Sequence, residues 1–155
     1  NAIGLRFFTV YGPWGRPDMA YYKFADKILA GKAIDVYNNG DMRRDFTYVD
    51  DIVDGIVAML THTLSNEKTH SHAVYNLGNN QPEKLMDMIE ILSRVLNKKI
   101  DINYLPMQPG DVYETFADIT ETTEAFGFKP KVNLEEGLSR FGEWYLPYAQ
   151  KNNLN

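Results

Sequence analysis

The stretch that decides the fold class is Ala2-Ile-Gly-Leu-Arg-Phe-Phe-Thr-Val10, a mostly apolar run with no polar lead-in. Strands of this composition are buried on both faces and lie in the middle of parallel sheets, where helices cover both sides. The run therefore predicts such a strand over residues 2–10. Because a natural domain seldom begins there, we expect the chain to be a piece of a longer polypeptide, starting inside an α/β domain.

Further strands and helices alternate along the remaining sequence. Hydrophobic spacing and turn residues predict strands at 34–37, 45–49, 73–77 and 99–105, and helices at 19–30, 50–60, 85–96, 120–126 and 134–148. Asp50 and Asn133 are candidate helix caps, and the polar stretch 61–72 is expected to be a loop. This mixture of strands and helices indicates the α/β class.

Composition excludes several kinds of protein. The 155 residues carry a net charge of −5, which argues against a general nucleic-acid binder. The longest unbroken apolar stretch, 56–60, is far shorter than the ~20 residues of a membrane-spanning helix, so no membrane association is expected. There is no cysteine and no secretory leader pattern, so we expect a cytoplasmic location.

Three arginines and a threonine are the first candidates for binding a ligand. Arg43 and Arg44 follow a glycine turn and precede a strand, where adjacent guanidinium groups can grip phosphate or form a solvated surface pair. Thr9 ends the first strand and Arg16 follows in a Pro/Gly loop. Ligands of α/β sheets lie beyond the carboxyl ends of strands, so both residues are placed to touch one, although each also fits an ordinary strand or loop position.

The remaining candidates have simpler explanations. Tyr37, just before Asn38-Asn39-Gly40, could stack on a flat base or belong to the core. His70 and His72 have the spacing of a metal pair but lack a third ligand nearby, so no metal site is predicted. The sequence contains no Gly-x-Ser-x-Gly motif, no Walker loop and no Gly-x-Gly-x-x-Gly motif.

Four ordered motifs carry a family resemblance. They are Leu5–Ala20 (LRFFTVYGPWGRPDMA), Gly40–Ile52 (GDMRRDFTYVDDI), Tyr75–Gly78 (YNLG) and Gln108–Val112 (QPGDV). Together they resemble the C-terminal half of an extended short-chain dehydrogenase/reductase. The resemblance spans essentially all 155 residues and is strongest to the NAD-dependent nucleotide-sugar epimerases that act on UDP-glucuronate at carbon 4.

The resemblance implies a division of the chain. Residues 1–155 would be the substrate-binding part of an incomplete epimerase: late strands of a Rossmann-type parallel sheet plus the smaller substrate-binding subdomain. Residues 1–10 and 73–78 would be strands of the dinucleotide-binding sheet whose remainder is absent. Partners would be a UDP-sugar, the missing N-terminal half and a second copy in a homodimer.

It also implies roles for particular residues. Thr9 and Arg16 would hold the sugar carboxylate, Tyr37 would lie beside the uracil, and Arg44 with Arg43 would meet the diphosphate. Gln108 and Asp111 would reach the ribose and phosphate region, although many relatives carry Arg where Gln108 stands. The segment Tyr11, Gly12 and Pro13 would pass near the nicotinamide of NAD.

The mechanism implied by the resemblance needs groups that this sequence lacks. A tyrosine of a Tyr-x-x-x-Lys pair would deprotonate the hydroxyl at sugar carbon 4 while NAD takes the hydride, giving a 4-keto intermediate that turns over before the hydride returns. No tyrosine here is followed four residues later by lysine, so we expect the fragment alone to be inactive. The alternatives are part of a related decarboxylase or 4,6-dehydratase, or a free-standing non-catalytic nucleotide-sugar binding module.

Overall fold

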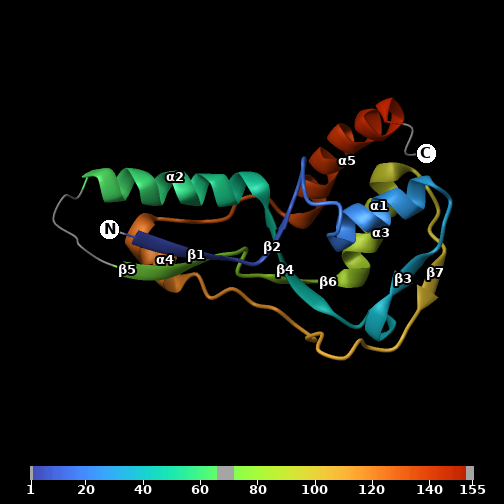
Figure 1. Cartoon of the computed structure of the whole chain (residues 1–155), viewed down its shortest axis with the longest axis horizontal. Helices are drawn as coiled ribbons and strands as arrows, with labels where there is room; N and C mark the ends of the chain where they lie inside the picture. The colour runs from blue at the N-terminus through green and yellow to red at the C-terminus, as the bar shows by residue number, and fades with distance from the viewer. Residues whose placement is uncertain (1, 66–71, 153–155) are drawn as a thin grey trace.

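The computed structural model describes residues 2–65 and 72–152. Figure 1 shows an elongated molecule with one strand pair and its helices at one end and a helical cluster at the other. In chain order the elements are β1 (Ala2–Phe7), β2 (Thr9–Tyr11), α1 (Ala20–Leu29), β3 (Ile34–Val36), the 3-10 turn η1 (Tyr37–Gly40), β4 (Arg43–Tyr48), α2 (Val49–Ser65), β5 (His72–Leu77), β6 (Pro82–Lys84), α3 (Leu85–Leu96), β7 (Ile102–Tyr104), α4 (Thr120–Phe126) and α5 (Leu134–Lys151). The α/β class with parallel strands is confirmed.

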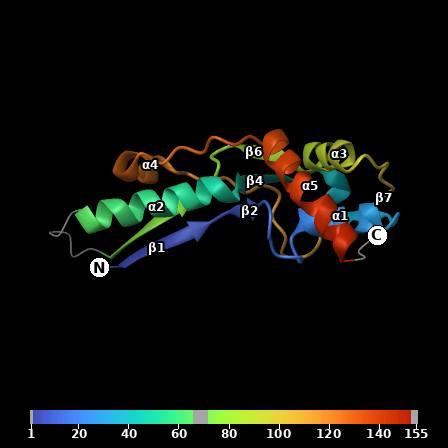
Figure 2. The same cartoon turned by 90° about the horizontal axis from the view of Figure 1, so that it is seen from above.

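We call β1, β5, α2 and α4 the strand-pair region. β1 and β5 are parallel, with Ala2 opposite His72 and Phe7 opposite Leu77. Ile52 and Met59 on the inner face of α2 are buried in a small core with Leu77. Figures 1 and 2 show that α2 runs alongside this strand pair.

The first strand differs from its prediction in two ways. Residues 2–7 are half-buried or exposed, with Phe7 50% exposed, so the expected burial on both faces is wrong for the described chain. The strand also breaks at Phe8, whose N–H donates to the Leu77 carbonyl while its own carbonyl accepts from the Val10 N–H at 3.0 Å. That turn-like bond redirects the chain, so β2 pairs with β4 instead of β5.

We call α1, α3 and α5, with β3 and β7, the helical region. Its core is aromatic: Tyr21, Phe141 and Tyr145 are at most 1% exposed, and the rings of Phe141 and Tyr145 stack with centroids 5.1 Å apart. The predicted apolar face of the last helix is confirmed, except that Tyr148 lies at its half-buried margin. As predicted, the Asn133 side chain caps α5 by accepting from the Glu136 N–H at 2.9 Å.

Three local predictions need correction. The helix α2 continues to Ser65, where a loop over 61–72 was expected; residues 66–71 of that stretch lie outside the described residues. In this last part of α2 the hydroxyls of Thr61, Thr63 and Ser65 donate to carbonyls four residues earlier, which satisfies these polar side chains within the helix. Asp50 lies inside the first turn of α2 and not before it. The strand β6, which begins with Pro82 and pairs antiparallel with β4, was not predicted.

The three-stranded sheet β2-β4-β6 joins the two regions. At its centre the Asp45 carboxylate is fully buried and accepts hydrogen bonds from the backbone N–H groups of Asn79 and Ala117 at 2.6 and 3.0 Å. Asp51 does the same for Lys131 and Val132, each at 3.1 Å. Two buried carboxylates therefore fasten later segments of the chain to β4 and α2. No helix among the described residues is long and apolar enough to cross a membrane.

Candidate functional site

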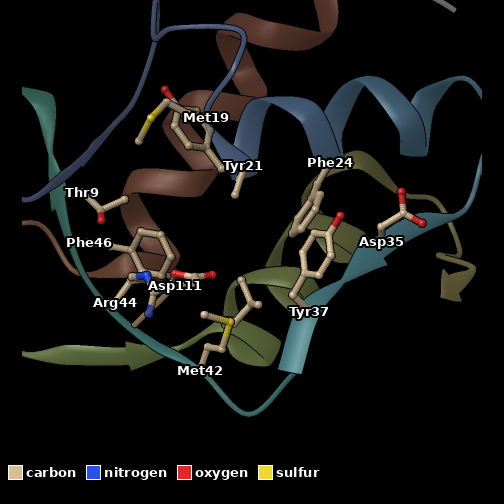
Figure 3. A pocket seen from close by; sticks show the side chains of 12 residues that line it. Thr9, Met19, Tyr21, Phe24, Asp35, Tyr37, Met42, Arg44, Phe46 and Asp111 are labelled. Carbon is tan, nitrogen blue, oxygen red and sulfur yellow. Dashed lines mark hydrogen bonds and ion pairs between the residues drawn. The ribbon is translucent and has the colours of Figure 1, made fainter. Parts of the chain in front are cut away.

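A cavity of about 260 Å³ lies where β2, α1, β3 and β4 meet. Its wall is mostly apolar, and its polar groups stand at two sides (Figure 3). Arg44 and Asp111 lie on one side, while Phe24 and Tyr37 lie on the other. The complete lining is Thr9, Met19, Ala20, Tyr21, Phe24, Asp35, Tyr37, Met42, Arg44, Phe46, Leu85 and Asp111.

Hydrogen bonds hold both terminal nitrogens of the Arg44 guanidinium group. One terminal nitrogen, Nη1, donates to the carbonyls of Arg43 and Tyr113 at 2.8 and 3.1 Å. The other, Nη2, donates to Asp111 Oδ1 at 2.7 Å. The Arg44 side chain is only 18% exposed, so this cation is preorganised at the cavity wall.

Asp111 reaches Arg44 because its segment runs along β4. The backbone N–H of Arg43 donates to the Tyr113 carbonyl at 2.9 Å, and the N–H of Thr115 donates to the Arg43 carbonyl at 3.2 Å. The Asp45 N–H adds a bond to Thr115 Oγ1 at 3.0 Å. These bonds fix a segment more than 60 residues away in the sequence against the strand that carries Arg44.

Tyr37 owes its position to a tight turn. Asn38, Asn39 and Gly40 have φ values of 48°, 52° and 84°, the left-handed conformation that these residue types tolerate best, as the turn prediction required. A Cβ at Gly40 would lie 2.6 Å from the sulfur of Met86, so a larger residue would have to displace the Met86 side chain and adopt a strained φ. Tyr37 is half-buried, which leaves part of its ring available to the cavity.

Thr9 and Asp35 add polar groups to the cavity from two parallel pairs of strands. Thr9 lies opposite Phe46 in the β2–β4 pair. Asp35, beyond Tyr37 in Figure 3, accepts from Lys27 at 2.6 Å and from Asn103 at 3.1 Å. The hydrogen bond from Lys27, with a second from Asn103, lowers the pKa of Asp35, so this carboxylate is charged and already paired at neutral pH.

The structure does not bring all the predicted residues into this cavity. Arg16 has a 75% exposed side chain and donates through Nε and Nη2 to Asp18, at 3.0 and 2.6 Å. Arg43 is half-buried and lines no part of the cavity with its side chain. Gln108 is exposed and does not line the cavity, and its carbonyl accepts from the Asp111 N–H at 3.2 Å. Asp18 does line a neighbouring cavity of about 360 Å³ that shares Phe24 and Tyr37.

The segment Tyr11, Gly12 and Pro13 has mainly structural contacts. Tyr11 is 2% exposed, and its hydroxyl donates to the Asn133 carbonyl at 3.3 Å. Gly12 has a φ of 142°, and a Cβ there would lie 2.7 Å from Cγ1 of Val49. Any contact between Tyr11 or Gly12 and a ligand therefore has to come from the backbone.

A dinucleotide needs a different feature, a glycine-rich turn whose N–H groups meet the pyrophosphate at the start of a helix. The segment before α1 offers no such turn, because Tyr21 fills the space beside Gly15, where a Cβ would lie 1.6 Å from its hydroxyl. Among the described residues, the segment before α1 therefore does not fit the pyrophosphate of NAD, and no hydride step is derived from it.

Sequence reasoning missed most of the apolar wall. Tyr21 and Phe24, one turn apart on α1, belong to the core and also face the cavity. Burial raises the pKa of Tyr21, and its hydroxyl donates to the Gly12 carbonyl at 3.2 Å. Met42 and Leu85 are adjacent because the Leu85 N–H donates to the Met42 carbonyl at 2.9 Å. The spacing of Tyr21 and Phe24 on α1 could have indicated that both lie on one side of the helix. The contact between Met42 and Leu85 depends on strand β6, which was not predicted.

Histidines and carboxylates form no cluster that could hold a metal ion within residues 2–65 and 72–152. His72 lies at the start of β5, and His70 lies outside the described residues. The cavity thus offers an aromatic side, an apolar floor and one fixed guanidinium group. That arrangement suits a ligand with a flat ring and an anionic group, and about 260 Å³ accommodates part of such a ligand, since sites for whole ligands span ~300–1,000 Å³.

Comparison with known proteins defines the class. Residues 1–78 match the NAD dependent epimerase/dehydratase family. The chain belongs to this family, whose members are NAD-dependent, and its fold is that of the extended short-chain dehydrogenase/reductases.

Within that family the chain is similar to enzymes that act on UDP-glucuronate. It is 47% identical over 162 residues to UDP-glucuronate 4-epimerase 2 of Arabidopsis thaliana, covering 97% of this chain and 37% of the relative. An uncharacterized protein of Methanocaldococcus jannaschii is 54% identical over 144 residues, covering 93% of this chain and 42% of the relative.

A solved structure is also similar to this chain. The UDP-glucuronic acid 4-epimerase of Bacillus cereus, in complex with UDP-glucuronic acid and NAD, superposes with a TM-score of 0.82 at 33% identity. The match covers 93% of this chain and 45% of that one. The chain thus spans less than half the length of these relatives.

Proposed function

We propose that this chain is the substrate-binding portion of an NAD-dependent UDP-glucuronate 4-epimerase, which converts UDP-glucuronate to UDP-galacturonate through a 4-keto intermediate. The observation that carries the proposal is the preorganised Arg44 guanidinium on the wall of a cavity whose other side is aromatic. The similarity to UDP-glucuronate 4-epimerases supports it.

In this proposal Tyr37 lies against the uracil and Arg44 binds the diphosphate. Asp111 already accepts from Nη2 of Arg44, so the diphosphate takes over or shares that donor while Asp111 turns toward the ribose. We expect Gln108 to reach the ribose and phosphate region and Arg43 to reach the diphosphate, although neither lines the cavity. Firm contacts to the nucleotide leave the hexose free to turn over, which inversion at carbon 4 requires.

Thr9 and Arg16 hold the sugar carboxylate. In the 4-keto intermediate that carboxylate is β to the ketone and can leave as carbon dioxide. A guanidinium that keeps the breaking bond out of line with the carbonyl π system suppresses that loss. Arg16 reaches the ligand by exchanging the carboxylate of Asp18 for that of the substrate, a substitution of one bidentate partner for another.

Calorimetric titration with UDP tests the nucleotide site. We expect the purified protein to bind UDP, and Arg44→Ala to weaken that binding by about 2–5 kcal/mol because a partly buried charged contact is lost. Arg140→Ala, which removes an exposed arginine on α5, is the matched control. Equal affinity of the unmodified protein and Arg44→Ala would remove the basis of the proposal.

The carboxylate contact is tested with UDP-glucuronate in the same way. Arg16→Ala should cost about 2–5 kcal/mol of UDP-glucuronate binding if the contact is desolvated, and should leave UDP binding unchanged. In an active enzyme the same variant should release more carbon dioxide. Unchanged affinity, turnover and product would show that Arg16 does not bind the sugar carboxylate.

Catalysis by the whole enzyme is proposed to need residues outside this sequence. Residues 1–10 and 73–78 would be strands of the dinucleotide-binding sheet, and the Gly-rich turn and Tyr-x-x-x-Lys pair would belong to the other half. We expect no UDP-galacturonate when the 155-residue chain is incubated with NAD and UDP-glucuronate. Product formed by this chain alone would overturn the assignment.

An apolar stripe indicates where that other half packs. Its residues lie three or four positions apart on the outer face of α2. They are Val53, Val57, Leu60 and Leu64, which are 49%, 54%, 57% and 72% exposed. We propose that the missing half covers this stripe in the complete enzyme, and that two copies of the isolated chain cover it by forming a homodimer. Sedimentation should show the dimer, and Val57→Glu should make it a monomer; a monomeric unmodified chain would contradict this.

A further inference from the structure

Trp14 combines a positive φ with an exposed aromatic side chain. It lies in the loop between β2 and α1, two residues before Arg16, with a φ of 60°. Glycine adopts that conformation freely, whereas a bulky residue held there is strained. The side chain is also 78% exposed, so burial in the core does not explain the strain.

Two aromatic rings of α5 hold Trp14 in place. Its ring centroid is 5.1 Å from that of Trp144 and 5.9 Å from that of Tyr148. Trp144 and Tyr148 are themselves stacked, 4.9 Å apart and 22° from parallel, and Trp144 also contacts the buried Phe141 at 5.9 Å. The exposed indole therefore sits on a platform that the core of the helical region keeps rigid.

The rest of the loop is fixed close to its ends. The Tyr21 hydroxyl donates to the Gly12 carbonyl at 3.2 Å, and the Met19 N–H donates to the Arg16 carbonyl at 3.1 Å. Gly15 lies so close to Tyr21 that a Cβ would fall 1.6 Å from its hydroxyl oxygen. Trp14 connects this loop to α5 through its ring contacts with Trp144 and Tyr148.

The Arg16 side chain pairs within its own loop. Its guanidinium donates to Asp18, which lies in the same loop, and 75% of its side chain is exposed. Arg16 lies two residues beyond Trp14 in the same loop, so the ring contacts of Trp14 and the position from which the Arg16 side chain extends are linked through the backbone of residues 14–16.

We propose that Trp14 is a positioning residue for Arg16: seated on Trp144 and Tyr148, it keeps the loop in the conformation from which Arg16 binds the carboxylate of a nucleotide-bound uronic sugar. The inference rests on the proposed function, since it supplies Arg16 with its ligand. Its consequence is selective, because Trp14 then affects carboxylate-bearing sugars and not neutral ones.

Paired titrations with UDP-glucuronate and UDP-glucose test the proposal. Trp14→Ala should weaken UDP-glucuronate binding about tenfold or more, because a misplaced contact group loses most of its effect, while UDP-glucose affinity changes less than about twofold. Trp14→Phe, which keeps a ring on the platform, should restore most of the loss. Trp14→Gly relieves the strained φ but has no ring, so it should resemble Trp14→Ala.

A double-mutant cycle asks whether Trp14 acts through Arg16. If it does, Trp14→Ala combined with Arg16→Ala should lose no more UDP-glucuronate affinity than Arg16→Ala alone. Because the chain has two tryptophans, Trp14 and Trp144, their coupling gives an exciton signal in far-ultraviolet circular dichroism. That signal should be present in the unmodified protein and absent in Trp14→Phe.

The outcomes separate this inference from the proposed function. If Arg16→Ala discriminates between the two ligands and Trp14→Ala does not, or if the two effects simply add, the positioning role is wrong while the proposed function stands. If Arg16→Ala weakens neither ligand, the carboxylate contact fails and this inference fails with it. Failure of the unmodified protein to bind either ligand overturns both.

Discussion

The helical region and the strand-pair region differ in how fully their apolar residues are buried. In the helical region the rings of Tyr21, Phe141 and Tyr145 are at most 1% exposed, and three helices enclose them. In the strand-pair region β1 is half-buried or exposed, and α2 has apolar residues on both its inner and outer faces. Of the twelve residues that line the cavity with Arg44, five belong to the helical region and none to the strand-pair region. We therefore expect nucleotide binding to depend more on the packing of the helical region than on that of the strand-pair region.

The largest effect is expected when an aromatic ring is removed from the core of the helical region. Phe141→Ala should lower the free energy of unfolding by about 3–5 kcal/mol, because a fully buried ring leaves a cavity that its neighbours do not fill. Urea denaturation followed by circular dichroism measures the loss. Phe116→Ala, at a residue 54% exposed, is the control and should change stability by less than about 0.5 kcal/mol. Equal losses in the two variants would show that the helical region does not carry the stability of the chain.

The same contrast explains which predictions from sequence succeeded. The helices 85–96 and 120–126 were predicted with their observed bounds, since spacing and stop signals are local. The burial of β1 was predicted wrongly, because the amount of covering structure is not encoded in the strand itself.

The candidate site shows a similar division. Motifs pointed to Thr9, Tyr37, Arg44 and Asp111, which the structure brings to one cavity. They did not indicate the contacts of Asp111, because its approach to Arg44 depends on hydrogen bonds between segments far apart in the sequence. The exposed position of Arg16, which pairs with Asp18 in its own loop, is likewise described by no spacing rule.

The second prediction concerns Asp45, whose buried carboxylate binds two later segments of the chain to β4. Asp45→Asn should lower the free energy of unfolding by about 1.5–3 kcal/mol, because hydrogen bonds to a buried charged carboxylate are replaced by weaker ones and one backbone N–H faces an amide donor. Hydrogen exchange should rise at Asn79 and Ala117, while exchange of the α5 core stays protected. Loss of protection throughout α5 instead would mean that the two regions unfold as a single unit.

A smaller effect is expected at the start of α5. Asn133→Ala removes the side-chain oxygen that accepts from the Glu136 N–H and should cost about 1 kcal/mol. Asn133→Ser and Asn133→Asp, which restore an acceptor, should recover most of it. Thermal unfolding of the three variants measures the series, and a loss that neither replacement recovers would place the contribution of Asn133 in its backbone contacts, such as the carbonyl that accepts from Tyr11.

The smallest change at neutral pH is expected from Tyr22→Phe in the helical region. Tyr22 is 5% exposed, and burial raises its pKa to about 12 from 10.0. The unfolded chain releases this proton near pH 10 and the folded chain near pH 12, so the folded state binds more protons between these values and loses stability as the pH rises. Tyr22→Phe should therefore resemble the unmodified protein at pH 7 and lose stability less steeply between pH 10 and 12. Denaturation curves at both ends of that interval measure the difference, and parallel losses in the two proteins would mean that Tyr22 ionises in the folded state as readily as in the unfolded chain.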